Sequence, residues 1–259
     1  MDEKLIKAQT VEYYDSLATD INRKDQKATH LCTSIVDEQS APSLPAAAAR
    51  LYCGCDSPFN YATLNNTLRV VDLGCGAGHD VFLAANALKE HATIVGIDIS
   101  PAMVEIAQQN LDGFPLKNHQ IFFRLADIEL YPMPRNFADL VLSNNTIHLC
   151  PNPSAVYRNI FRALRPDGTV IYSDIVKTKE SKLATIPPLL KEKDHITTLQ
   201  SLSFVEVEIV NRQYFTHEQA KSHCKPILRG LNNQTPSAVS LEDEIYAITL
   251  RAKRPPFSC

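Results

Sequence analysis

Short apolar runs alternate with longer amphipathic stretches between positions 68 and 176 of the chain. The short runs are bounded by Gly, Pro, Asp or Asn, which is typical of buried strands, and the amphipathic stretches repeat apolar residues at helical spacing. Val81, Ala85 and Leu88, for example, share one helical face. The predicted strands are 68–73, 93–98, 120–125, 138–143 and 169–175, and the predicted helices are 79–90, a stretch that starts at Pro101, and 153–165. This alternation predicts an α/β fold with a doubly wound, mostly parallel sheet covered by helices on both faces.

The segments on either side of this core follow other patterns. Residues 1–20 resemble a short amphipathic helix, and residues 30–60 are rich in loop-forming residues, with a short alanine helix at 46–49. Residues 204–210 and 244–250 look like strands without the helical crossover that parallel strands need, so we expect a closing strand pair at the sheet edge. We therefore divide the chain into an N-terminal cap (1–66) that contains Cys32, Cys53 and Cys55, a core (67–178), and a C-terminal region (179–259) that completes the sheet.

Composition excludes several classes of protein. The net charge of -3 provides no basic field for nucleic acid or an anionic membrane, and no apolar run is long enough to span a bilayer. The first residues lack the pattern of a signal peptide. Seven cysteines, an odd number scattered over 259 residues, favour reduced thiols over a disulfide framework. We expect a cytoplasmic monomer that acts on a small molecule.

A glycine loop follows the first predicted strand. Asp72 and Leu73 precede Gly74-Cys75-Gly76-Ala77-Gly78, and the next strand ends on Asp98. Glycines let the backbone approach a ligand closely, and a carboxylate at the next strand end can bind both hydroxyls of a ribose. Ligands of parallel sheets bind outside the carboxyl ends of the strands, which brings Gly74–Gly78, Asp98, Asp127 and Ser143–His148 around one crevice.

This region resembles the class I S-adenosylmethionine (SAM) methyltransferases, which have a Rossmann-like fold. The resemblance is carried, in family order, by Asp72–Gly78, Gly96–Ser100, Ala126-Asp127, Asp139–Asn144 and Leu164–Gly168. It implies that Gly74 and Gly76 pass the methionine part of SAM, that Asp98 binds the ribose, that Asp127 and Ile128 flank the adenine, and that Ser143 lies near the sulfonium. Asp72 would order the loop, and Gly78 would serve either helix packing or the ligand. The expected cofactor-binding residues are Tyr14, Asp72, Gly74, Gly76, Gly78, Asp98, Ile99, Asp127, Ile128 and Ser143.

The N-terminal segment resembles that of the arsenite methyltransferases. Tyr13-Tyr14 precedes Cys32-Thr33-Ser34, and Arg50–Pro58 follows with one inserted residue around Cys53. The resemblance implies that Cys32 and Cys55 carry the two N-terminal cysteines of that family. Thiolates are soft ligands that suit trivalent arsenic, whose lone pair would attack the methyl group without a strong base. Glutathione or another thiol would be a co-substrate, and S-adenosylhomocysteine the product.

The chain also departs from that family. Asn145 stands where the family has an arsenic-binding cysteine, and no cysteine occurs in Pro188–Ser203. Cys150 or Cys224 is the candidate replacement. The candidate catalytic residues are therefore the thiols of Cys32, Cys55 and Cys150, together with His148 as a base or a hydrogen-bonding residue beside SAM.

Other functions stay open at this point. Cys32, Cys53 and Cys55 could bind a metalloid or zinc, although their spacing lacks the two-residue gap of zinc knuckles. The scaffold could also methylate a small organic acceptor at oxygen, nitrogen, carbon or sulfur. A third alternative is a non-catalytic metalloid-binding protein that keeps the fold.

Overall fold

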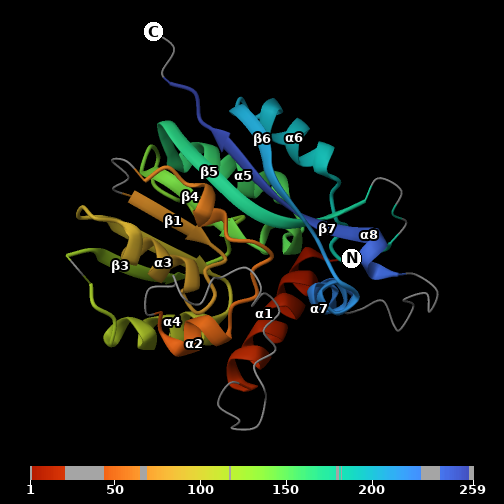
Figure 1. Cartoon of the computed structure of the whole chain (residues 1–259), viewed down its shortest axis with the longest axis horizontal. Helices are drawn as coiled ribbons and strands as arrows, with labels where there is room; N and C mark the ends of the chain where they lie inside the picture. Colours follow the sequence, from red (N-terminus) through yellow and green to blue (C-terminus); the bar gives the residue numbers. More distant parts are fainter. Residues whose placement is uncertain are drawn as a thin grey trace.

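The computed structural model describes residues 2–20, 44–64, 69–116, 118–178, 181, 183–228 and 240–256. Across these residues the chain forms one seven-stranded sheet with the order β3-β2-β1-β4-β5-β7-β6 (Figure 1). The strands from β3 to β5 are parallel to their neighbours, and β7 is antiparallel to both β5 and β6. The strands are β1 (Arg69–Leu73), β2 (Thr93–Asp98), β3 (Gln120–Leu125), β4 (Ala138–Asn144), β5 (Leu164–Lys177), β6 (Val205–Tyr214) and β7 (Ile245–Lys253).

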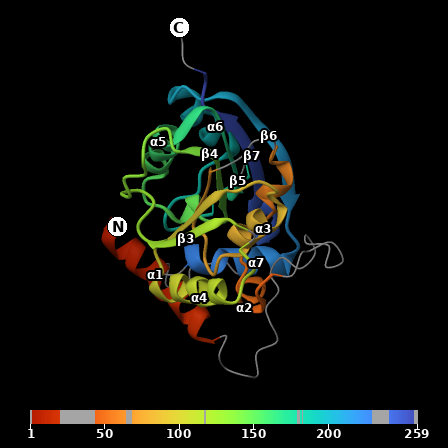
Figure 2. The ribbon, with the colours of Figure 1, turned by 90° about the vertical axis from the view of Figure 1, so that its left-hand side faces the viewer.

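Helices cover both faces of this sheet (Figures 1 and 2). The helices are α1 (Glu3–Asp20), α2 (Ala46–Arg50), α3 (His79–Ala87), α4 (Pro101–Asp112), α5 (Pro153–Ala163), α6 (Glu192–Ser201), α7 (His217–Leu228) and α8 (Leu241–Glu244), with short 3-10 helices η1 (Pro58–Tyr61) and η2 (Ile147–Leu149). Val70 of β1 packs with α3 and α4, whereas its neighbour Val71 packs with α5. Successive residues of a strand point to opposite faces, so both faces of β1 are buried, and the prediction of a doubly wound sheet is confirmed.

The closing strand pair is also confirmed, because β7 lies between β5 and β6 at one edge of the sheet. Element ends differ by a few residues from the predictions. The helix predicted at 153–165 ends at Ala163, and β5 begins at Leu164, since the chain pairs with Ala138 before it turns at Asp167.

The pattern analysis missed α6, although acidic residues in its first turn and the buried pair His195 and Leu199 mark a capped amphipathic helix. None of the helices in the described ranges has the length and apolar character needed to cross a membrane.

Candidate active site

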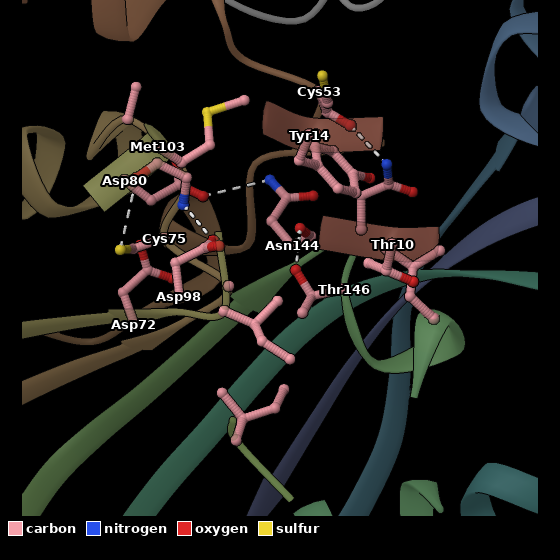
Figure 3. A pocket seen from close by; sticks show the side chains of 18 of the residues that line it. Thr10, Tyr14, Cys53, Asp72, Cys75, Asp80, Asp98, Met103, Asn144 and Thr146 are labelled. Carbon is pink, nitrogen blue, oxygen red and sulfur yellow. Dashed lines mark hydrogen bonds between the residues drawn. The ribbon is translucent and has the colours of Figure 1, made fainter. Parts of the chain in front are cut away.

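An open cavity of about 940 Å³ lies at the carboxyl ends of the parallel strands. In Figure 3, Asp72, Cys75 and Asp98 lie on one side of it, and Thr10, Tyr14 and Cys53 lie on the other. The described residues that line it are Lys7, Thr10, Tyr14, Ala48, Leu51, Tyr52, Cys53, Gly54, Asp72, Gly74, Cys75, Gly76, Ala77, His79, Asp80, Asp98, Ile99, Met103, Asp127, Ile128, Glu129, Asn144, Asn145, Thr146, Leu149, Cys150 and Pro151. The cavity is open to solvent and combines apolar side chains with a few polar groups, as small-molecule sites do.

Glycine occurs at three positions of the loop for different structural reasons. All three have positive φ, of 75° at Gly74, 51° at Gly76 and 94° at Gly78. A methyl group on Gly74 would overlap the side chain of Thr146, and one on Gly78 would lie 2.7 Å from Phe82. At Gly76 no described atom lies within 4 Å of that position. Gly76 therefore faces open cavity, whereas Gly78 serves the packing of α3 and is not among the described lining residues.

Asp98 joins the loop to the next strand. Its carboxylate accepts hydrogen bonds of 2.8 Å from the backbone N–H groups of Gly76 and Ser100. Burial raises the pKa of Asp98, and these backbone bonds oppose that rise. A partly buried carboxylate with free lone pairs at a strand end is suited to bind a ribose diol. Ile99 lines the cavity beside it.

Carboxylates gather around the loop. Burial raises the pKa of Asp72 well above its usual value, and the nearby charges of Asp80 and then Asp98 raise it further. Such a cluster is stabilised by a cationic ligand, because a positive charge relieves both the repulsion and part of the desolvation cost.

Helix α1 closes one side of the cavity. Lys7 Nζ lies 2.7 Å from Asp127 Oδ2 and also contacts Glu129, and these hydrogen bonds raise the pKa of Lys7 against the opposing effect of burial. Asp15 accepts a 2.6 Å hydrogen bond from the hydroxyl of Ser100. Helix α1 is thus held against the cavity at two points, and Tyr14 between them lines it as expected.

Two cysteines are among the described residues that line the cavity, Cys53 from the N-terminal segment and Cys150 after η2. Burial raises the pKa of Cys53 to about 11, and raises the pKa of Cys150 well above its usual value. Burial thus favours the protonated form of both thiols. Cys55 and Cys224 are fully buried in an apolar cluster and are not among the described residues that line the cavity. Cys32 lies outside the described residues.

Asn144 fixes the segment that carries Cys53. Its side-chain oxygen accepts the Cys55 N–H at 3.0 Å, and its amide nitrogen lies 2.6 Å from both the Tyr52 hydroxyl and the Asp56 carbonyl oxygen. Asp56, buried in turn, accepts hydrogen bonds from Asn211 of β6 at 2.9 Å and from Thr249 of β7. The loop is therefore held by both halves of the sheet.

Two predicted site residues lie beneath the cavity instead of lining it. The Ser143 hydroxyl donates a 2.8 Å hydrogen bond to the carbonyl oxygen of Leu73, so it ties β4 to β1. The His148 side chain is buried, and its Nδ1 lies 2.5 Å from Asp174 Oδ1. Neither residue is among the described lining residues.

The described residues contain no cluster of three or more His, Cys, Asp or Glu side chains that could hold a metal ion. Zinc binds thiolates, and the raised pKa of Cys53 and of Cys150 makes thiolates costly to form there.

Comparison with known sequences gives the family. The profile of the family described as "Methyltransferase domain" matches residues 64–229. An arsenite methyltransferase of Halobacterium salinarum is 35% identical over 133 residues, which cover 51% of this chain and 34% of that protein. Phosphoethanolamine N-methyltransferase 1 of Arabidopsis thaliana is 29% identical over 127 residues, which cover 49% of this chain and 25% of that protein. The match thus spans about a third of the length of the first relative, and less of the second.

Solved structures share the fold. CrArsM, an arsenic(III) S-adenosylmethionine methyltransferase from Chlamydomonas reinhardtii, superposes with a TM-score of 0.64 at 21% identity, covering 84% of this chain and 73% of that one. The [4+2]-cyclase SpnF gives the same TM-score at 20% identity and covers 95% of both chains. The fold confirms the predicted class I architecture, and the match over residues 64–229 shows that the chain belongs to the methyltransferase domain family.

Proposed function

We propose that this protein is a SAM-dependent methyltransferase that methylates arsenic(III) held by the thiols of Cys53 and Cys150. The observation that carries the proposal is their position. The two cysteines come from segments nearly a hundred residues apart, yet both are among the residues that line the same cavity as Gly76 and Asp98. The proposal includes a monomeric, cytoplasmic enzyme, which sedimentation and cell fractionation would test.

The glycine-loop side of the cavity fits SAM. Gly76 leaves the space that the methionine part needs, and Asp98 has the position and lone pairs to bind the ribose. Asp127 and Ile128 line the cavity and would flank the adenine, and a cationic cofactor would favour the ionised form of Asp72. When bound, SAM supplies an electrophilic methyl group.

Protonated thiols are suited to arsenous acid. As each sulfur–arsenic bond forms, one arsenic–oxygen bond breaks, and the thiol proton leaves with the hydroxyl group as water. Cys53 and Cys150 would thereby release two waters and leave one hydroxyl group on arsenic. The arsenic lone pair then attacks the methyl group, so no side chain has to act as a base, and the residues mainly position the reactants. Methyl transfer formally oxidises arsenic by two electrons, which glutathione or another thiol would return.

Asn145 supports the thiol loop in this proposal. Its amide nitrogen donates a 2.7 Å hydrogen bond to the Cys53 carbonyl oxygen. The residue therefore acts on the position of Cys53, although it does not supply a thiol of its own. The role of Cys32 and of Cys55 as arsenic ligands stays a prediction from the sequence.

The test measures methylarsenic species and S-adenosylhomocysteine from purified protein, SAM, arsenite and glutathione. We expect Cys53→Ser and Cys150→Ser each to lower arsenite turnover at least about 100-fold while SAM binding stays within about twofold, since one ligand to the nucleophile is lost. Cys224→Ala, a buried cysteine away from the cavity, is the matched control and should keep its activity. Full turnover by both serine variants would rule out the thiol site.

A small organic acceptor is the second candidate. It is favoured by the amide of Asn145 where a third thiol would be expected, and by relatives such as the phosphoethanolamine N-methyltransferase, 29% identical over part of its length. Turnover of an organic amine or alcohol by the Cys53→Ser/Cys150→Ser double variant would support it. A protein that binds arsenite without ever forming S-adenosylhomocysteine would instead be a non-catalytic binder.

A further inference from the structure

The short helix η2 and the residue after it border both the cavity and the protein interior. Leu149 and the following Cys150 line the cavity, whereas the His148 side chain points into the interior and is 1% exposed. Residues adjacent in sequence thus divide between the cavity wall and the core. The backbone N–H of Cys150 donates a 3.0 Å hydrogen bond to the carbonyl oxygen of Ile147, so the position of Cys150 depends on how η2 is held.

Asp174 of β5 holds η2 through two hydrogen bonds. The backbone N–H of His148 donates to Asp174 Oδ2 at 2.8 Å, and its ring Nδ1 lies 2.5 Å from Oδ1 of the same carboxylate. Thr146, which precedes η2, makes no side-chain capping bond among the described residues. Asp174 therefore satisfies an N-terminal N–H of η2 that the helix cannot satisfy itself.

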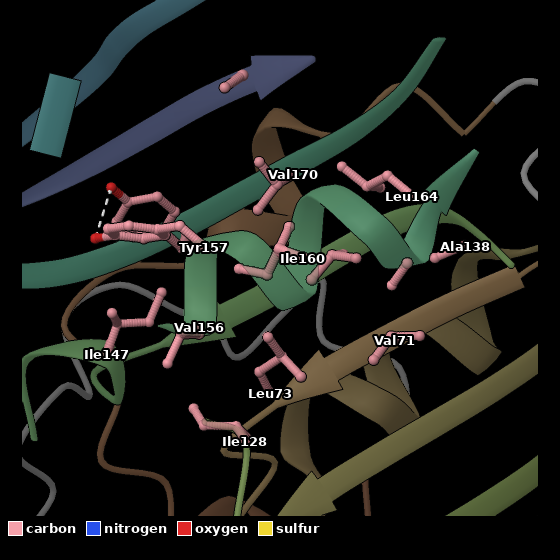
Figure 4. Packing of buried hydrophobic residues seen from close by; sticks show 14 of the residues in the cluster. Val71, Leu73, Ile128, Ala138, Ile147, Val156, Tyr157, Ile160, Leu164 and Val170 are labelled. Carbon is pink, nitrogen blue, oxygen red and sulfur yellow. Dashed lines mark hydrogen bonds between the residues drawn. The ribbon is translucent and has the colours of Figure 1, made fainter. Parts of the chain in front are cut away.

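The anchor beneath η2 is rigid. Asp174 is fully buried in β5, which pairs with β4 on one side and β7 on the other, and it also accepts the Ile175 N–H at 3.1 Å. Ile147, at the start of η2, lies in the same apolar cluster as Val156 and Tyr157 of α5 (Figure 4).

We propose that His148 and Asp174 are positioning residues that hold Cys150 at the acceptor site. The proposal rests on the proposed function for the role of Cys150. The His148 ring is not among the described residues that line the cavity, and its Nδ1 is engaged by Asp174, so it acts through η2 and not as a base. A displacement of about 1 Å at a reacting group can cost about 100-fold in rate, so a loosened η2 is visible in turnover.

The kinetic test compares His148→Leu with His148→Asn, because an asparagine amide can place an N–H near the position of Nδ1. His148→Leu should raise the arsenite KM at least about 10-fold and lower kcat, with SAM affinity within about twofold. His148→Asn should restore both parameters to within about threefold of wild type. His195→Asn is the matched control, since His195 is equally buried but bonds Tyr157 and Tyr172 away from the cavity, and it should leave the arsenite KM unchanged.

A second readout does not depend on turnover. The rate of alkylation of Cys150 by iodoacetamide, followed peptide by peptide, should change several-fold in His148→Leu, stay at the wild-type rate in His148→Asn, and leave the rate at Cys53 unaltered. Because His148→Leu leaves a buried carboxylate without its partner, the double variant His148→Leu/Asp174→Asn is measured beside it.

The outcomes separate the two proposals. A wild-type protein that does not methylate arsenite refutes the proposed function, and the alkylation rates still test the positioning role. Unchanged Cys150 alkylation in folded His148→Leu and in the double variant overturns that role. Failure of His148→Asn to restore the wild-type values, or an equal rise in KM in His195→Asn, also overturns it.

Discussion

Alanine substitution at Gly78 should lower the stability of the fold, whereas alanine substitution at Gly76 should weaken SAM binding. At Gly78, with φ of 94°, a methyl group would lie 2.7 Å from Phe82 and 2.9 Å from Phe123. The left-handed conformation costs alanine about 1–2 kcal/mol and overpacking about 1–3 kcal/mol, offset by about 0.4–1 kcal/mol from a less flexible unfolded chain. Gly78→Ala should therefore lose about 2–4 kcal/mol and lower Tm by roughly 5–15 °C.

Gly76→Ala should instead be nearly neutral for folding. Its φ of 51° lies in the left-handed region, but no described atom lies within 4 Å of the added methyl group, so the net cost is at most about 1.5 kcal/mol. If SAM binds as proposed, the same methyl group would enter the space of its methionine part, and we expect the Kd for SAM to rise at least about 10-fold, or 1.4 kcal/mol.

The assay pairs thermal unfolding of the ligand-free protein with calorimetric titration of SAM. Gly113→Ala is the control, because Gly113 has ordinary φ of -103° and no described atom within 4 Å of an added methyl group. It should leave both Tm and Kd near the wild-type values. The reasoning is refuted if Gly78→Ala weakens SAM binding without lowering Tm, or if Gly76→Ala lowers Tm strongly while binding SAM normally.

Three further substitutions test other parts of the site. Burial, together with Asp80 and Asp98, raises the pKa of Asp72, so its ionisation costs stability as pH rises from about 4 toward the raised value. Asp72→Asn should therefore be more stable than wild type at pH 7 and equal to it near pH 3 in urea melts, with weaker SAM binding; a loss of stability at pH 7 would contradict this. Gly54→Ala places a methyl group 2.5 Å from the Asn144 amide nitrogen, which should break about 1–2 of the hydrogen bonds made by that side chain. The arsenite KM should therefore rise about 10-fold, with the Kd for SAM unchanged. Lys7→Met removes the cation beside Asp127 and Glu129, and it should cost about 1 kcal/mol and speed hydrogen exchange in α1; unchanged exchange would show that this contact does not hold the helix.

The part of the site proposed to bind the cofactor follows from local sequence. A strand, a glycine loop and an acid at the next strand end place Gly76 and Asp98 by backbone geometry alone, and the structure has both in the cavity. The sequence does not identify Lys7 as a site residue, because its partner Asp127 lies 120 residues away and a lysine on an amphipathic helix is normally solvated.

The part of the site proposed to bind the acceptor depends on contacts between residues that are far apart in the sequence. Cys53 and Cys55 are equivalent in a pattern, yet only Cys53 is among the described residues that line the cavity. The difference is set by Asn144 and by Asp56, whose partner Thr249 is 193 residues away. Likewise His148 and Cys150 are near neighbours in sequence, and the tight turn of η2 sends their side chains in different directions.

The protonation state of the thiols narrows the choice of acceptor further than the fold does. A divalent cation held by Cys53 and Cys150 would have to displace two protons from thiols whose pKa burial has raised, to about 11 at Cys53, and release them to solvent. In the proposed function, arsenous acid avoids this cost, because each thiol proton departs with a hydroxyl group as water. Under the proposed function, the burial that disfavours zinc at these two cysteines still permits a neutral acceptor such as arsenous acid, whose own lone pair attacks the methyl group.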